Sequence, residues 1–169
     1  MSQLKNGVDV EALNATLSAI KLDPAKAKFK FRSMTHWLGG ARSRTEIKDF
    51  VLESDEPIPL LGSNIAPNAV EMVLAALGSC LSVGFAYSAA GMGINLQSLE
   101  LNIEGDLDVH GFLGLSKEIR PGYKNIRVAI RLKSDASGEK IKELFDHVIE
   151  TSPVTDIIRN PVPVDILLE

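Results

Sequence analysis

The segment Ala69 to Ala90 reads AVEMVLAALGSCLSVGFAYSAA, a long run of apolar and small residues. Asn68 precedes it as a favourable helix N-cap, and Glu71 stands three positions later, the spacing of a capping box. Gly91 follows the run, and glycine often ends a helix. The pattern predicts one helix of roughly 33 Å. Because none of its faces is polar, we expect it to be buried on nearly all sides.

The length of this run would also permit a transmembrane helix. However, Gly78, Ser79 and Ser82 make the run small rather than strongly hydrophobic, and Glu71 lies inside it. No cluster of Lys or Arg marks either end, as it would beside a membrane span. The sequence therefore favours the core helix of a soluble protein, and we expect no membrane partner.

Composition indicates one soluble globular unit, since the 169 residues are 45% hydrophobic and 24% charged. A net charge of -4 argues against nucleic acid or an anionic membrane as the main partner. Cys80 is the only cysteine, which excludes an internal disulfide framework, and the N-terminus has no apolar signal segment. We expect a cytoplasmic protein.

The remaining elements suggest an α+β fold rather than regular βαβ alternation. In the first half, we predict a helix over Val8–Lys21, strands over Phe29–Trp37 and Thr45–Leu52 around a Gly39-Gly40 turn, and a loop over Glu53–Asn68.

The second half predicts two half-exposed strands, one helix and a final strand. The strands centre on Leu99–Ile103 and Ile126–Leu132, where apolar and polar residues alternate. Gly105–Tyr123, with four glycines and a proline, is predicted as a loop or an irregular pair of strands. Ser137 caps a helix that Ser152-Pro153 ends, and Val162–Leu168 returns as a short strand. The apolar face of that helix comprises Ile141, Leu144, Phe145 and Val148.

Cys80 is the candidate nucleophile, although a buried free cysteine usually behaves as an inert small hydrophobe. It lies too far into its helix for the dipole to activate it, so a reactive thiolate would need a cation from elsewhere. Arg42 and Arg44 are the candidates, unless both are solvated strand residues. Glu71 does not share a face with Cys80, but it can orient an arginine.

A metal or nucleotide cofactor is not expected. The histidines His36, His110 and His147 are far apart and lack metal-ligand spacing. The sequence also contains no dinucleotide-binding glycine motif, no phosphate-binding loop and no serine nucleophile elbow.

The stretch NAVEMVLAALGSCL at Asn68–Leu81 closely resembles the OsmC/Ohr family, named for osmotically inducible protein C and the organic hydroperoxide resistance protein. The resemblance runs from near Lys28 to the C-terminus. It divides the chain into a helical extension, residues 1–24, and a single OsmC-like domain, residues 25–169. It also includes HWLGG at 36–40, GIN at 93–95, GDLD at 105–108 and RPGY at 120–123.

The resemblance implies two long helices wrapped by antiparallel strands in an intertwined homodimer. It also implies an antioxidant role, in which a peroxidatic cysteine attacks an organic hydroperoxide and a second cysteine forms a disulfide with it. Cys80 matches the first cysteine and Glu71 the family's glutamate, while the family's arginine falls at Arg42 or Arg44. Ser152 occupies the place of the second cysteine. Turnover would then require an external thiol, or a dithiol such as dihydrolipoamide.

Three functional hypotheses follow. The first is a one-cysteine thiol peroxidase acting on organic hydroperoxides. The second is a dimer that binds an apolar small molecule, or senses thiols at Cys80, without turnover. The third is a purely structural dimer with no cavity next to Cys80.

Overall fold

The computed structural model describes residues 4–168. They form a mixed α+β fold, as predicted, divided into two compact units. One unit comprises the residues up to Asn14 together with those from Ala76 onward, and the other is Ala15–Ala75. The long helix α2, Ala69–Gly91, belongs to both. The division into residues 1–24 and 25–169 stays a prediction.

The start of α2 confirms the predicted capping box. The Asn68 side chain accepts a hydrogen bond from the Glu71 N–H at 2.9 Å, and the Glu71 carboxylate accepts one from the Asn68 N–H at 2.8 Å. Each residue thus satisfies a backbone donor that the helix itself cannot pair. The helix ends at Gly91, where the sequence placed its stop.

The predicted burial of α2 on nearly all sides is not met within one chain. Leu77, Leu81 and Phe85 are buried on one face, whereas Val83 is 48% and Tyr87 is 52% exposed. By length and composition, α2 is the one helix among the described residues that could cross a membrane, a test that core helices of soluble proteins also pass. A single chain of this size covers only part of so long an apolar helix.

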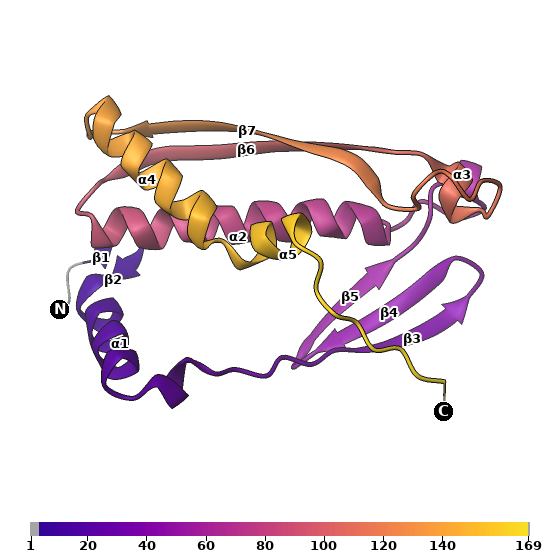
Figure 1. Ribbon diagram of the computed structural model, residues 1–169, viewed down its shortest axis with the longest axis horizontal. Coiled ribbons are helices and arrows are strands. Elements are labelled where there is room, and N and C mark those ends of the chain that lie inside the picture. Colours follow the sequence, from indigo (N-terminus) through magenta and orange to yellow (C-terminus); the bar gives the residue numbers. More distant parts are fainter. Residues whose placement is uncertain (1–3, 169) are drawn as a thin grey trace. The chain divides into compact units, whose positions relative to one another are not determined.

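Two long strands cover the buried face of α2 (Figure 1). Strands β6, Leu96–Leu107, and β7, Tyr123–Ser134, form an antiparallel pair in which Leu101 lies opposite Ile130. Their alternating apolar side chains pack against the core, while the intervening polar residues face outward. A short helix, α3, Val109–Phe112, stands in the predicted loop between them.

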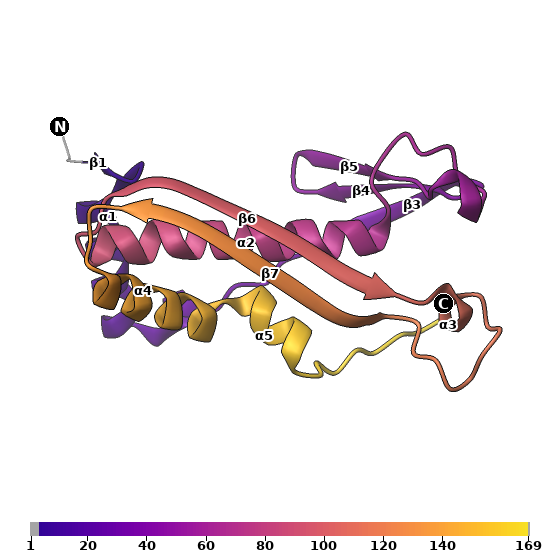
Figure 2. The same ribbon diagram turned by 90° about the horizontal axis from the view of Figure 1, so that it is seen from above.

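Helices α4, Gly138–Thr151, and α5, Pro153–Arg159, lie alongside α2 (Figure 2). Ser137 caps α4 as predicted, and its residues Leu144 and Val148 are buried in the core. The break before Pro153 is confirmed, but the sequence did not predict that the chain continues as α5.

The N-terminal segment is attached to the same unit by Asn6. Strands β1, Leu4–Lys5, and β2, Val8–Asp9, precede helix α1, Val10–Leu22, so the helix starts two residues later than predicted. The Asn6 amide donates to the Ile94 carbonyl at 2.9 Å and accepts from the Leu96 N–H at 2.9 Å. The Asn6 side chain thus hydrogen-bonds to the backbone of Ile94 and Leu96, where the chain passes from α2 to β6.

The second unit contains a three-stranded antiparallel sheet in the order β3-β4-β5. The predicted single strand over Thr45–Leu52 is wrong, because Lys48 adopts a left-handed φ of 56° and reverses the chain there. The predicted strand beginning at Phe29 starts only at Met34. The three strands are β3, Met34–Gly39, β4, Arg42–Ile47, and β5, Phe50–Ser54. The sheet is flanked by two 3-10 turns, η1, Pro24–Ala27, and η2, Ile58–Leu60.

The predicted strand over Val162–Leu168 is also wrong. These residues are extended and exposed, with no regular secondary structure. Pro161 and Pro163 each lack the backbone N–H that a strand donates to its neighbour, and this segment pairs with no strand in the described chain.

Candidate functional site

The structure brings together Cys80 and Ser152, which are 72 positions apart in the chain. Both were candidate site residues in the sequence analysis. Cys80, half-buried on α2, places its Sγ 3.3 Å from the Ser152 Oγ. Ser152 ends α4 and caps α5, so the junction of these helices positions its hydroxyl against the thiol. Ser152, which the family resemblance matched to the second cysteine, therefore contacts Cys80.

Thr155 completes this cluster and was missed by the sequence reasoning. Its N–H and its hydroxyl donate to the Ser152 Oγ at 3.3 Å and 2.8 Å. Ser152 is only 5% exposed and Thr155 only 8%, so both hydroxyls are shielded from water. The signal was present in Ser152-Pro153-Val154-Thr155, where serine followed by proline is typical of a helix start.

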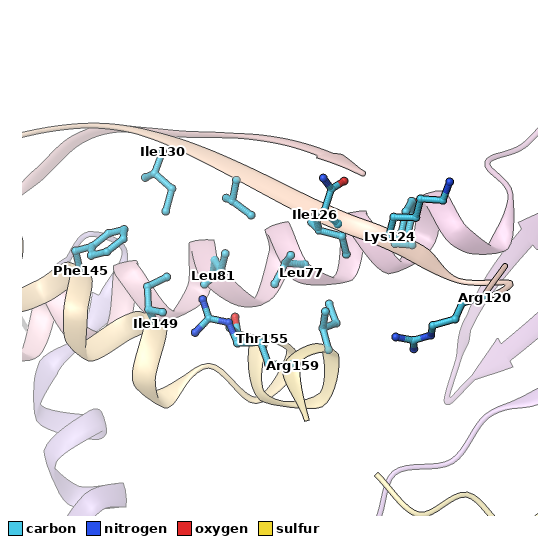
Figure 3. Close-up of a pocket in the computed structure, with 14 residues that line it drawn as sticks. Leu77, Leu81, Arg120, Lys124, Ile126, Ile130, Phe145, Ile149, Thr155 and Arg159 are labelled. Carbon is cyan, nitrogen blue, oxygen red and sulfur yellow. The ribbon is translucent and has the colours of Figure 1, made fainter. Parts of the chain in front are cut away.

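A pocket of about 580 Å³ lies beside the cluster, between α2, β7, α4 and α5 (Figure 3). Thr155 forms part of its wall, and Cys80 itself does not line it. Its size is within the range of small-molecule sites. The apolar part of the lining comprises Leu77, Leu81, Ile126, Val128, Ile130, Phe145, Ile149 and Ile158.

Three cationic side chains also line this pocket. Arg120 and Lys124 come from the start of β7 and the residues before it, and Arg159 comes from the end of α5. Lys124 pairs with Asp108 at 3.0 Å. Hydrogen bonds from His110 and Lys124 hold the pKa of Asp108 well below its usual range. The pocket is thus lined by both apolar and cationic side chains.

Arg42 and Arg44, the predicted partners of the thiolate, both bind Glu53 within the three-stranded sheet. Their guanidinium groups lie 3.4 Å and 2.9 Å from its carboxylate. The hydrogen bond from Arg44, with further contributions from Arg42, lowers the pKa of Glu53 despite partial desolvation. Their action on Cys80 stays a prediction.

Glu71 has a structural role as the partner in the capping box. Within residues 4–168, no arginine forms an ion pair with it, so its predicted function of orienting an arginine also stays a prediction. The same part of the chain contains no group of three His, Cys, Asp or Glu side chains that could hold a metal ion.

Comparison with protein families matches residues 62–167 to the model described as OsmC-like protein. The match covers more than half of the chain and includes Cys80, Ser152 and Thr155. The chain therefore belongs to the OsmC-like family. Comparison with curated proteins gives no match.

Solved structures show the same fold. An OsmC-like protein from Mycoplasma pneumoniae matches with a TM-score of 0.69 at 16% identity, covering 79% of this chain and 90% of its own. An organic hydroperoxide resistance protein OsmC from Legionella pneumophila matches with a TM-score of 0.60 at 19% identity, covering 78% and 90%. An organic hydroperoxide resistance protein from Elizabethkingia anophelis matches with a TM-score of 0.58 at 12% identity, covering 79% and 91%.

Proposed function

We propose that this protein reduces organic hydroperoxides through its single cysteine, Cys80, and contributes to oxidative stress defence in the cytoplasm. The observation that carries the proposal is the hydroxyl of Ser152 in hydrogen-bonding contact with the Cys80 sulfur, next to an apolar pocket. Two of the structural neighbours are described as organic hydroperoxide resistance proteins, which supports the same reaction class.

The first half-reaction needs only the thiolate and the peroxide. The Cys80 sulfur attacks one oxygen of the O–O bond, so that an S–O bond forms as the O–O bond breaks. Cys80 is oxidised by two electrons to a sulfenic acid. The hydroperoxide is reduced to an alkoxide, which takes a proton from water and leaves as the alcohol. The apolar pocket suits the organic part of such a substrate.

The second half-reaction requires an external thiol, because Ser152 cannot form a disulfide with Cys80. One thiol condenses with the sulfenic acid, releasing water and leaving a mixed disulfide. A second thiol group then attacks this disulfide and restores the Cys80 thiol. A dithiol such as dihydrolipoamide supplies both groups in one molecule.

The direct test is to mix purified protein with one equivalent of cumene hydroperoxide or hydrogen peroxide and follow the intact mass. We expect rapid gain of one oxygen, or a mixed disulfide when a thiol is added, and faster reaction with the organic peroxide. Cys80→Ser is the control and should not react. Reaction of the wild type no faster than a free thiol would contradict the proposed function.

The serine at position 152, which cannot form a disulfide, supports a second candidate function. In this alternative the protein binds an apolar ligand in the same pocket without turnover. This alternative predicts saturable binding of a hydrophobic fluorescent probe, weakened by Phe145→Ala in the pocket wall, together with no catalytic loss of peroxide in the presence of dihydrolipoamide.

We also propose that two copies of the chain assemble as a homodimer. The half-exposed apolar residues Val83 and Tyr87 on α2 support this, because a second copy could cover them.

A further inference from the structure

Three groups form a continuous set of contacts at the start of α5. The Cys80 Sγ contacts the Ser152 Oγ at 3.3 Å, and the Ser152 Oγ contacts the Thr155 Oγ1 at 2.8 Å. The Thr155 N–H also points to the Ser152 Oγ, at 3.3 Å. Ser152 and Thr155 are buried, so water does not offer them competing partners.

The hydrogen-bonding capacity of a serine hydroxyl determines how this set is arranged. A hydroxyl has one proton to donate and two lone pairs that accept. Both donors of Thr155, its N–H and its O–H, are directed at the Ser152 oxygen. With its two lone pairs occupied, Ser152 can interact with the Cys80 sulfur only by donating its own proton.

A donated proton favours the ionised form of Cys80. A thiolate only accepts hydrogen bonds, whereas a neutral thiol would direct its own weakly polar proton at an oxygen with no free lone pair. We infer that Thr155 is a positioning residue: by fixing Ser152 as a donor, it raises the reactivity of Cys80. This inference rests on Cys80 being the reacting group of the proposed function.

Both donors of Thr155 are needed for this role, but only the side chain makes it specific to a threonine or serine at this position. Any residue except proline at position 155 would offer the same N–H to the Ser152 cap. Only a hydroxyl at this position can occupy the second lone pair. Thr155→Val keeps the shape and the cap but removes the hydroxyl, whereas Thr155→Ser keeps the hydroxyl.

Alkylation of Cys80 by iodoacetamide, measured across pH, tests the inference without any peroxide. We expect Thr155→Val to slow alkylation at neutral pH by roughly three- to tenfold, the effect of one hydrogen bond, and to move the pH profile to more alkaline values. Thr155→Ser should restore both. Thr151→Val is the matched control: its hydroxyl binds the His147 carbonyl in α4, and its loss should leave the rate unchanged.

A second variant separates hydrogen bonding from packing. Ser152→Ala removes the donor, so it should slow alkylation at least as much, and adding Thr155→Val to it should cause no further loss. If Thr155→Val fails to fold, Thr155→Ala takes its place, and the Ser152→Ala rate still tests the donated proton on which the role of Thr155 depends. A wild-type rate and pH profile in folded Thr155→Val, equal slowing in Thr155→Ser, or unchanged alkylation in Ser152→Ala would overturn the inference. Failure of peroxide reduction with normal alkylation behaviour would instead contradict only the proposed function.

Discussion

Asp55 is a buried carboxylate that organises the loop leading to α2. It is 2% exposed and accepts hydrogen bonds from the backbone N–H groups of Glu56, Ser63 and Ile65 at 2.8, 2.9 and 3.3 Å. Burial alone would raise its pKa, but these three donors outweigh it and lower the pKa below the ordinary value. The loop therefore depends on a charged Asp55.

Because the folded-state pKa of Asp55 is lowered, its contribution to stability is present above the unfolded pKa of about 4 and is lost as the pH falls below it. We therefore expect the loop amides to be less protected from hydrogen exchange at pH 3 than at pH 7, when protection is measured against exchange of the unfolded chain. Asp55→Asn should exchange fast at pH 7 and lose this pH dependence. Asp49→Asn in an exposed turn is the control, and hydrogen exchange is the measurement. Equal protection in wild type and Asp55→Asn at pH 7 would contradict this role.

At the same scale, the sequence predicted part of the site. Cys80 stood out as the only cysteine, and the family resemblance pointed to Ser152, before the Pro-Val pair; the structure places the two in contact. Thr155 was missed although Ser152-Pro153 signalled a helix start, because the role of its hydroxyl depends on the turn of helix after Pro153. A side chain that acts through another is visible only once the backbone between them is known.

Among the elements, α4 attaches to the core through one apolar face, and Leu144 on this face is 0% exposed. Truncation to alanine would leave a cavity, so Leu144→Ala should lower the free energy of unfolding by about 2–5 kcal/mol. The exposed neighbour Glu143→Ala provides the control and should change it by less than about 0.5 kcal/mol. Urea denaturation followed by circular dichroism measures both. Equal midpoints for the two variants would show that α4 does not stabilise the fold.

The same elements show where sequence patterns are informative. Alternation predicted β6 and β7 well, because one face of each packs on the core and the other does not. The strand prediction failed at Thr45–Leu52, where the turn uses Lys48-Asp49 instead of the Asn-Gly type of signal. It failed again at Val162–Leu168, because an apolar alternating segment becomes a strand only when a neighbouring strand accepts it.

For the whole molecule, the exposed apolar side of α2 raises the question of assembly. The sequence predicted a helix buried on nearly all sides, and one chain buries one face of it. Either a membrane or a second copy of the chain could cover the exposed side of α2, and the two possibilities predict different results. A membrane helix would bring the protein into the lipid fraction, whereas pairing of two copies would give a soluble particle of twice the chain mass.

We expect light scattering to give twice the 18.3 kDa mass of one chain. Val83→Asp would place a charge on the apolar face of α2 that the second copy covers in the proposed dimer. Burying a charge without a partner costs free energy. Each 1.4 kcal/mol of that cost should weaken association about tenfold. Asn102→Asp adds the same charge on the exposed polar face of β6 and should leave the dimer intact. A wild-type mass of one chain in solution would exclude the dimer. Equal weakening by both variants would show that added charge alone, and not the α2 face, controls association.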